Sequence, residues 1–301
     1  MPQIVPTGKP IYSFSKEHEP VIKVDSGTRL VVEAYDCFEN QIQSDHTTMN
    51  SIDWNRINPA TGPIYVESAK PGDVLAVTIH SIEIGEKGVL ATGPNLGVMG
   101  HRIDEFTVKI TPIEDNYAIF NEKVKIPLNK MIGVIGVAPE DDAVPCGTPG
   151  NHGGNLDTLL IAEGATIYFP IFHEGALFGL GDMHAAMGDG EIGVSGIEVP
   201  GKADITLQVF KGKSLKHPVV KNSDGLSQLV SAKTLDEAAK TAVEEMVDLL
   251  LPHTDLELSE LTMLLSAIGH TQISQIVDPL LTARFFVPQW FLDTYNINIF
   301  R

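Results

Sequence analysis

The residues best suited to chemistry gather in one short stretch, "GDMHAAMGDGE", at positions 181–191. It places three acids and a histidine among glycines and alanines, whose small side chains contribute little packing. If residues 176–187 form a strand, Asp182 and His184 lie two positions apart and project from one face. A carboxylate and an imidazole on the same face can bind one Zn²⁺ ion, so we predict that both residues are metal ligands.

A turn follows the two predicted ligands. The run Gly188-Asp189-Gly190 is typical of a turn, and Glu191 is expected to begin the next strand. A carboxylate that returns across such a turn lies near the metal without binding it, which is the position of a general base. We therefore predict that Glu191 is the acid/base. The alternative is a polar hairpin in which Asp189 is an ordinary turn residue and no chemistry takes place.

A second polar stretch, "PCGTPGNHGGNLD" at positions 145–157, carries His152, Asn155 and Asp157. It is too rich in glycine for a regular element, and long irregular loops with convergent polar groups are often functional. Backbone N–H groups of such a loop can form an oxyanion site, and Asp157 can bind a metal. The alternative is a solvated connection with an exposed histidine.

A third polar cluster lies earlier in the chain. Asp36 follows a predicted strand and stands beside Cys37, and Gln41, Asp45 and His46 follow in a predicted loop. The adjacent Asp45 and His46 would point in opposite directions in a strand, so they can share a metal only in a loop.

These candidates need a framework, and roughly the first 220 residues are typical of short strands joined by turns. Apolar, β-branched or alternating runs are "GTRLVVEAYD", "DVLAVTIHSIEIG", "FTVKITPI" and "ADITLQVFKG". The 27 glycines and 19 prolines suit the many turns of a β-sandwich or barrel-like body.

Helices are expected after Lys233. Residues 234–252 open with the capping-box pattern Thr234-x-x-Glu237, and a second helix is expected within 255–269, with Gly269 at its end. The sequence therefore predicts a mainly β fold with C-terminal helices packed on it, α+β overall. Residues 1–225 would form the metal-binding catalytic body and 226–301 a helical region on it, or the two would form one continuous domain.

The charge balance narrows the range of partners. The chain has 301 residues, with 21 basic against 39 acidic side chains and a net charge of −18, which repels phosphate backbones and anionic lipids. It argues against nucleic acid and membrane partners and favours neutral or cationic small ligands and divalent cations. The first residues do not match a signal peptide, and no stretch reaches the length of a membrane span. Two cysteines make no disulfide framework, so a cytoplasmic enzyme is expected.

Taken together, the motifs resemble the acetamidase/formamidase family. The segments that carry the likeness keep the family's order across most of the chain: "DCFENQ", "NPATGPIYVESAKPGDVLAVTI", "GGNLD", "GDMHAAMGDGEI" and "QISQIVDP". The resemblance implies a β-rich homo-oligomer that hydrolyses formamide or acetamide to a carboxylate and ammonia. It also implies bound zinc, with calcium as a second metal.

The resemblance also marks site residues in three motifs. The motif "GDMHAAMGDGEI" contains Asp182, His184 and Glu191. The motif "GGNLD" contains Asn155 and Asp157, and "DCFENQ" contains Asp36. Together with His152 of the glycine-rich stretch, these residues make up the expected site. The expected catalytic residues are Glu191, Asn155 and His152. The expected metal ligands are Asp36, Asp157, Asp182 and His184. A calcium site among the remaining acids Asp45, Asp53 and Asp189 stays unplaced.

Other interpretations of the same residues stay open. A covalent amidase would use Cys146, since the chain has no Ser-Ser pair for the amidase-signature mechanism. A non-enzymatic β-domain would bind a metal or small ligand and leave Glu191 without a task. If the metal interpretation holds, Cys37 and Cys146 are dispensable for chemistry. The aromatic-rich stretch "LLTARFFVPQWFLDTYNINIF" favours a homo-oligomer, a dimer or larger, because so many apolar groups are seldom left in water.

Overall fold

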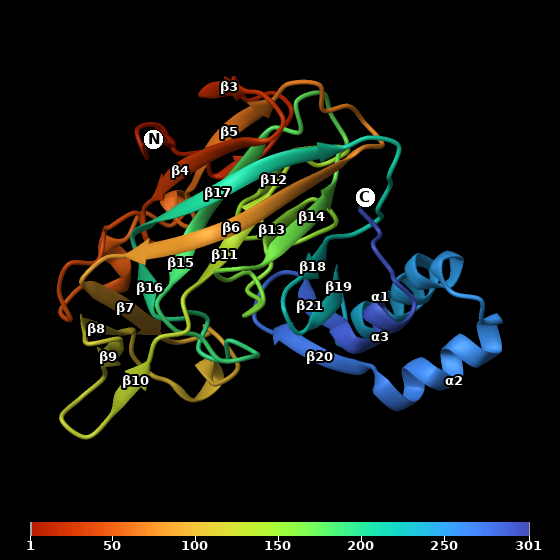
Figure 1. Ribbon diagram of the computed structural model, residues 1–301. Coiled ribbons are helices and arrows are strands. Elements are labelled where there is room, and N and C mark those ends of the chain that lie inside the picture. The colour runs from red at the N-terminus through yellow and green to blue at the C-terminus, as the bar shows by residue number, and fades with distance from the viewer. Residues whose placement is uncertain (1, 301) are drawn as a thin grey trace.

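The computed structural model describes residues 2–300, and its framework consists of two large β-sheets (Figure 1). The nine-stranded sheet has the order β1 (Gln3–Val5), β4 (Thr28–Ala34), β17 (Gly201–Phe210), β6 (Val74–Ile84), β14 (Thr166–Pro170), β18 (Val219–Lys221), β19 (Gly225–Ala232), β21 (Leu281–Pro288) and β20 (His270–Gln275). Except for β1, which runs parallel to β4, its neighbouring strands are antiparallel.

The ten-stranded sheet carries the residues of interest. Its main path is β10 (Lys125–Pro127), β9 (Tyr117–Ile119), β8 (Thr107–Glu114), β7 (Lys87–Thr92), β16 (Glu198–Val199), β15 (Phe178–His184), β11 (Met131–Gly136) and β13 (Gly153–Asn155). Strand β5 (Ala60–Val66) joins beside β15 and pairs in turn with β3 (Ile22–Val24). A separate two-stranded ribbon is formed by β2 (Ser13–Phe14) and β12 (Val144–Pro145).

The two sheets pack face to face through one hydrophobic core. Strand β17 alternates as its sequence predicts, so that Ile205 and Leu207 are fully buried while Asp204 and Gln208 face outward. The opposing sheet contributes Ile132 from β11 to the same core, together with Leu180 from β15. Figure 1 shows the long strands β4, β17 and β6 running across β15 and β11. The prediction of a mainly β fold is confirmed.

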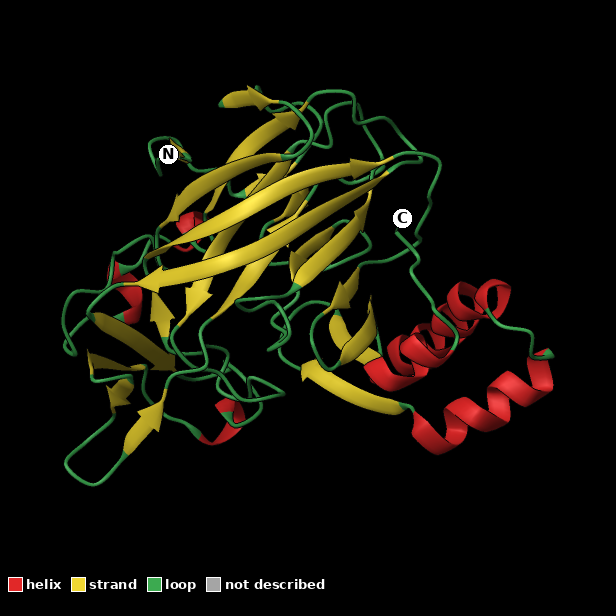
Figure 2. Cartoon of the chain, viewed as in Figure 1, coloured by secondary structure: helices red, strands yellow, loops and turns green. Residues whose placement is uncertain are grey.

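The C-terminal region extends the nine-stranded sheet and also carries the helices (Figure 2). Helices α1 (Leu235–Leu250), α2 (Leu258–Ile268) and α3 (Gln289–Thr294) accompany strands β19, β21 and β20 at one end of the molecule. Short 3₁₀ helices occupy 49–51, 54–56, 100–102 and 251–253. The sequence predicted only helices beyond residue 226, whereas the structure adds the hairpin β20–β21 and most of β19. The sheet therefore runs without a break past residue 225.

The two predicted helices form where expected. Thr234 Oγ1 accepts a hydrogen bond from the Glu237 backbone N–H at 3.2 Å, which caps α1. Gly269 follows α2, but its φ is −86°, so it does not provide the expected left-handed cap. Its role is close packing, because a Cβ at Gly269 would overlap the ring of Phe285.

The aromatic-rich C-terminal stretch packs within its own chain. Phe285, Phe291 and Phe300 are buried in a second hydrophobic core that also holds Met246 of α1. This stretch therefore gives no support to the predicted homo-oligomer, which stays a prediction. No helix among residues 2–300 has both the length and the apolar character needed to cross a bilayer.

Candidate metal centre

One buried imidazole nitrogen is surrounded by carboxylates. The Nε2 atom of His184 lies 3.2 Å from Glu198 Oε2 and 3.4 Å from Asp182 Oδ1. The same nitrogen lies 3.7 Å from Asp157 Oδ1 and 4.0 Å from Glu191 Oε1. All five side chains are at most 4% exposed. The structure thus brings together four of the residues expected from sequence, and it adds Glu198.

Strand β15 positions this cluster from the middle of the ten-stranded sheet. His184 is its last residue and pairs directly with Glu198 of β16 across an antiparallel ladder, so the two side chains share one face. On the other side, β11 pairs with β15 and with β13, after which Asp157 follows. The absence of a side chain at Gly133 of β11 gives the two aspartates the space they occupy, because a Cβ there would overlap the carboxylate oxygens of both Asp157 and Asp182.

The backbone is strained at three of the four acids. Asp157, Asp182 and Glu191 have φ values of 38°, 51° and 46°, in the left-handed region. Each such residue costs on the order of 1–3 kcal/mol, and such strain clusters at active sites and ligand clamps. Glu191 does not begin a strand as predicted: it lies in a loop after the isolated bridge between Gly190 and Gln275, and β16 starts only at residue 198.

Several polar atoms of the cluster are buried without a hydrogen-bond partner in the described chain. They are both carboxylate oxygens of Asp157, Oδ1 of Asp182, Oε2 of Glu198 and both ring nitrogens of His184. A buried polar group left unpaired costs about 1–3 kcal/mol, and more if it is charged. Nδ1 of His184 faces Gly196, whereas its Nε2 lies among the four carboxylates. Unpaired carboxylate oxygens gathered around an unpaired nitrogen indicate a bound cation that would satisfy them.

The electrostatics point to a cation. Burial raises the pKa of Asp157 and Glu198 well above the ordinary range, and it raises the pKa of Glu191 to about 8. Burial opposes a charge on His184, but the carboxylates of Glu198 and Asp182 outweigh it and raise the pKa of that imidazole. Burial also acts to raise the pKa of Asp182, yet its contact with His184 leaves the value lowered. Among residues 2–300, the positive group that acts on these four carboxylates is the imidazole of His184.

The types of the potential ligand atoms, and the distances between them, fit a divalent metal ion. Asp157, His184 and Glu191 form one set of potential ligands, and Cys37, Asp182 and Glu198 form a second. Within each set the ligand atoms all lie within 4.8 Å of one another. Ligand atoms about 2.1 Å from a tetrahedral zinc ion lie about 3.4 Å apart, close to the separations around His184 Nε2. The buried residues therefore fit zinc.

Three of the residues expected from sequence lie outside both ligand sets. Asp36 Oδ1 accepts hydrogen bonds from the backbone N–H groups of Phe38 (3.0 Å) and Asn40 (2.7 Å), and burial raises its pKa to about 6. His152 is buried edge-on against Phe14, and burial lowers its pKa to about 4. Asn155 lies on β13. Their assigned roles stay predictions.

Sequence reasoning missed three acidic or thiol groups at the site. Glu198 is the carboxylate nearest to His184 Nε2, and Cys37 joins the second ligand set. Asp278 accepts a hydrogen bond from Asn155 Nδ2 at 3.0 Å, and burial together with the charge of Asp157 raises its pKa. The available signals were a lone acid between Ile197 and Val199 and the position of Asp278 in "QISQIVDP".

The acids left over for calcium have protein partners. Asp45 Oδ1 accepts from the Ile110 N–H at 2.6 Å, and Asp53 Oδ1 accepts from the Asn55 N–H at 3.1 Å. Asp189 makes a two-pronged ion pair with Arg284 of β21, at 2.7 and 2.9 Å. The three residues therefore do not form a common group, and the calcium site stays a prediction without a location.

Arg284 links two segments of the site. Its buried guanidinium holds Asp189, two residues before Glu191, and also donates to Thr158 Oγ1 at 3.2 Å, next to Asp157. We expect Arg284→Lys, which cannot make the planar two-pronged contact, to lose about 1–3 kcal/mol of unfolding free energy. Because both site loops would shift, the kcat of the hydrolysis expected from the sequence should fall between about 10- and 100-fold.

The matched control for this prediction is Arg29→Lys. Arg29 makes the same two-pronged pair with Asp204, at 2.7 and 2.8 Å, but on the exposed face of the nine-stranded sheet. The midpoint of urea unfolding and the kcat of the expected hydrolysis should be almost unchanged in that variant. Equal losses in both variants would mean that Arg284 has no special connection with the site.

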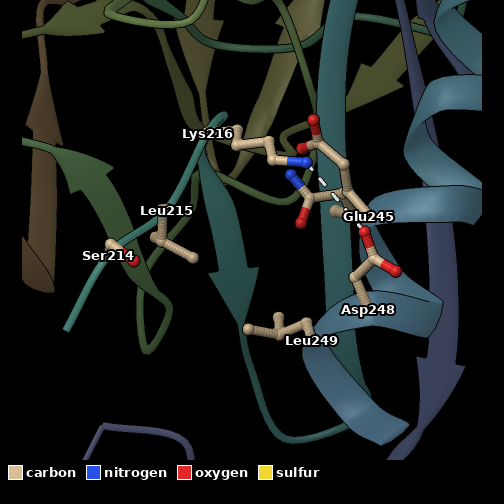
Figure 3. A pocket seen from close by; sticks show the side chains of 7 residues that line it. Ser214, Leu215, Lys216, Glu245, Asp248 and Leu249 are labelled. Atoms are coloured by element: carbon tan, nitrogen blue, oxygen red, sulfur yellow. Dashed lines mark ion pairs between the residues drawn. The ribbon is translucent and has the colours of Figure 1, made fainter.

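A pocket of about 470 Å³ adjoins the cluster, and Glu191 is part of its lining. A second pocket, of about 290 Å³, lies between α1 and the segment that precedes β18 (Figure 3). Its charged side chains have protein partners. Lys216 Nζ lies 4.0 Å from Asp248 Oδ2, and Glu245 Oε1 forms a hydrogen bond with His217 Nδ1 at 2.8 Å. None of the five clustered residues lines this second pocket, whereas Glu191 lines the first.

Known proteins match both the sequence and this fold. The model of the Acetamidase/Formamidase family matches residues 13–146 and 142–293. A crystal structure of a predicted acetamidase/formamidase from Thermoanaerobacter tengcongensis is 54% identical, with a TM-score of 0.97 over 99% of both chains. An acetamidase from Bacillus halodurans is 41% identical, with a TM-score of 0.95 over 98% of this chain and all of that one.

The match to a more distant relative covers about two thirds of each chain. The formamidase of Methylophilus methylotrophus is 24% identical in a match that covers 67% of this chain and 65% of that protein. A gamma lactamase from Delftia acidovorans, 19% identical with a TM-score of 0.66, shares the fold. The family model and the two whole-chain structural matches place this chain in the Acetamidase/Formamidase family.

Proposed function

We propose that this protein hydrolyses short aliphatic amides, such as formamide or acetamide, to a carboxylate and ammonia at the His184 cluster, with bound zinc. The observation that carries the proposal is the convergence of four buried carboxylates on His184 Nε2, with their unpaired atoms. Similar proteins named acetamidase and formamidase support the choice of reaction.

The metal would be held by residues of the two ligand sets. His184, Asp157, Asp182 and Glu198 supply the imidazole and carboxylate donors that zinc accepts, with the Cys37 thiol beside them. A bound zinc ion supplies Lewis acidity, which polarises an amide carbonyl and acidifies water. The chain's own contribution is to hold these donors in a dry, preformed arrangement.

Glu191 is assigned the proton transfers. Its carboxylate accepts a proton from water as the water oxygen attacks the amide carbon, and it returns that proton to the nitrogen as the C–N bond breaks. The products are the carboxylic acid and ammonia, which ionise in water to carboxylate and ammonium. Glu191 suits this role because its side chain lies at the cluster and also lines the adjoining pocket, through which a small neutral amide reaches it.

The covalent alternative finds little support at Cys146. The thiol is fully buried among Ile11, Phe14 and Val134, and it donates to the Ile11 carbonyl oxygen at 3.6 Å. Burial raises its pKa, which disfavours the nucleophilic thiolate.

We expect Cys146→Ala to keep the kcat for amide hydrolysis while it loses about 1 kcal/mol of unfolding free energy, because a small core side chain is trimmed. Ammonia release and urea unfolding measure the two effects. If the variant folds and holds its metal but does not turn over, Cys146 is the nucleophile and the metal mechanism is wrong.

The proposed function is tested by metal content and activity on the same preparation. Elemental analysis of the purified protein should find zinc, and formamide and acetamide should release ammonia. Chelation should stop that release, and added zinc should restore it. Metal binding without turnover of any amide would favour the non-enzymatic β-domain, while turnover by a metal-free protein would exclude the metal mechanism.

A further inference from the structure

We propose that the pocket beside Glu191 binds the acyl chain of the substrate, so that linear amides of three or four carbons are better substrates than acetamide. This inference rests on the proposed amide hydrolysis at the His184 cluster. We name the pocket the acyl pocket; the apolar side chains that line it include Leu90, Phe120, Ile126, Met187, Ile192 and Ile197.

The acyl pocket lies directly at the site. Glu191 belongs both to its lining and to the cluster, with Oε1 4.0 Å from His184 Nε2. One wall is the loop 186–197, which connects β15 to β16. The opposite wall is the hairpin of β9 and β10, which projects from the end of the ten-stranded sheet (Figure 1). A substrate whose carbonyl reaches Glu191 therefore has room on its acyl side.

The polar side chains of the acyl pocket already have protein partners, apart from Glu191. Asn129 accepts from the Met187 N–H at 3.0 Å and donates to the Met187 carbonyl oxygen at 2.9 Å. Ser195 pairs in the same way with Ala91, at 3.0 and 3.1 Å, and Asp189 pairs with Arg284. The side chains available to a ligand are thus mainly apolar, which suits a hydrocarbon chain.

The acyl pocket is also larger than formamide or acetamide. A water molecule occupies about 30 Å³, so the pocket of about 470 Å³ would keep most of its water around formamide or acetamide. Each added methylene buries apolar surface in place of that water. The expected gain in kcat/KM is about three- to fourfold per methylene while the chain still fits.

Phe120 offers a specific test of the wall. It follows β9, and the ammonium group of Lys109 lies 4.9 Å from the centre of its ring, which fixes one face of the ring. Phe120→Ala removes apolar surface from the acyl pocket but touches none of the clustered acids. The matched control is Val124→Ala at the tip of the same hairpin, where the side chain is 44% exposed and outside the pocket lining.

The experiment measures kcat/KM for formamide, acetamide, propionamide and butyramide with the metal-loaded protein and both variants. From acetamide to butyramide we expect the wild type and Val124→Ala to gain about three- to fourfold per methylene, and Phe120→Ala to gain less than about twofold. If acetamide is hydrolysed but propionamide and butyramide are not favoured over it, or if Phe120→Ala keeps the full gain, the acyl pocket proposal is wrong. If no amide in the series is hydrolysed, the proposed function itself fails.

Discussion

Replacing His184 with alanine is expected to remove both zinc and amide hydrolysis. His184 supplies the only imidazole among the five clustered side chains, and all four carboxylates approach its Nε2 within 4.0 Å. Loss of groups that merely support a ligand already weakens metal binding about 10- to 100-fold, so loss of the ligand itself should cost at least about 100-fold in zinc affinity. Zinc titration and ammonia release on the same variant measure the two losses.

The control for this experiment is His253→Ala, since His253 is exposed in the short helix 251–253, apart from the site. It should keep both zinc and activity. The comparison also separates folding from binding: the His184 variant should remain folded by circular dichroism but should lose the rise in Tm that added zinc gives the wild type. A His184 variant with undiminished zinc affinity would show that the metal lies elsewhere.

Replacing Glu191 with glutamine is expected to separate catalysis from metal binding. Glutamine keeps the size of the side chain and can hydrogen bond, but it cannot accept a proton. The variant should fold, keep its zinc and bind substrate, while kcat falls by at least about 100-fold. Asp182→Asn is the comparison, because a ligand variant should lose zinc together with activity.

The structure makes the contrary outcome specific. Glu191 belongs to the same potential ligand set as Asp157 and His184, so it is placed either to bind the metal or to move protons. Zinc lost in step with activity would identify Glu191 as a ligand and overturn the assignment. Near-normal turnover would place the general base at another carboxylate; Asp157 would be the first to test, since Asp189 is held by Arg284.

The strands and helices could be predicted from the sequence wherever the pattern that encodes them lies within a short stretch. The alternation of residues 203–209 gave β17, and Thr234 with Glu237 gave the start of α1, because both signals lie within a few neighbouring residues. Strand β20 was not predictable in this way. Its sequence "HTQISQ" is mostly polar and exposed, and it is a strand only because β21 pairs with it.

The site was predictable only in part, for a related reason. Asp182 and His184 are neighbours on one strand, so their spacing placed them together. Glu198 reaches His184 only through the register of β16 against β15, and Cys37 comes from a segment that precedes Asp182 of the same ligand set by 145 positions. No pattern in a single stretch of sequence encodes such a register. The strained φ at Glu191 likewise reflects the loop around it, which the expected strand did not include.

The strand order of the nine-stranded sheet has a consequence for how the chain folds. Strand β17 lies between β4 and β6, so residue 204 pairs with residue 31 on one side and residue 81 on the other. Contacts of such long sequence separation require large loops to close first, which makes folding slow. Asp278 and Arg284 are synthesised after β17. A ribosome-bound chain that still lacks them has an unfinished nine-stranded sheet and an incomplete candidate metal centre. Until β17 emerges, β4 and β6 have unpaired edges open to other chains, so nascent chains of this protein should depend on chaperones that shield such edges.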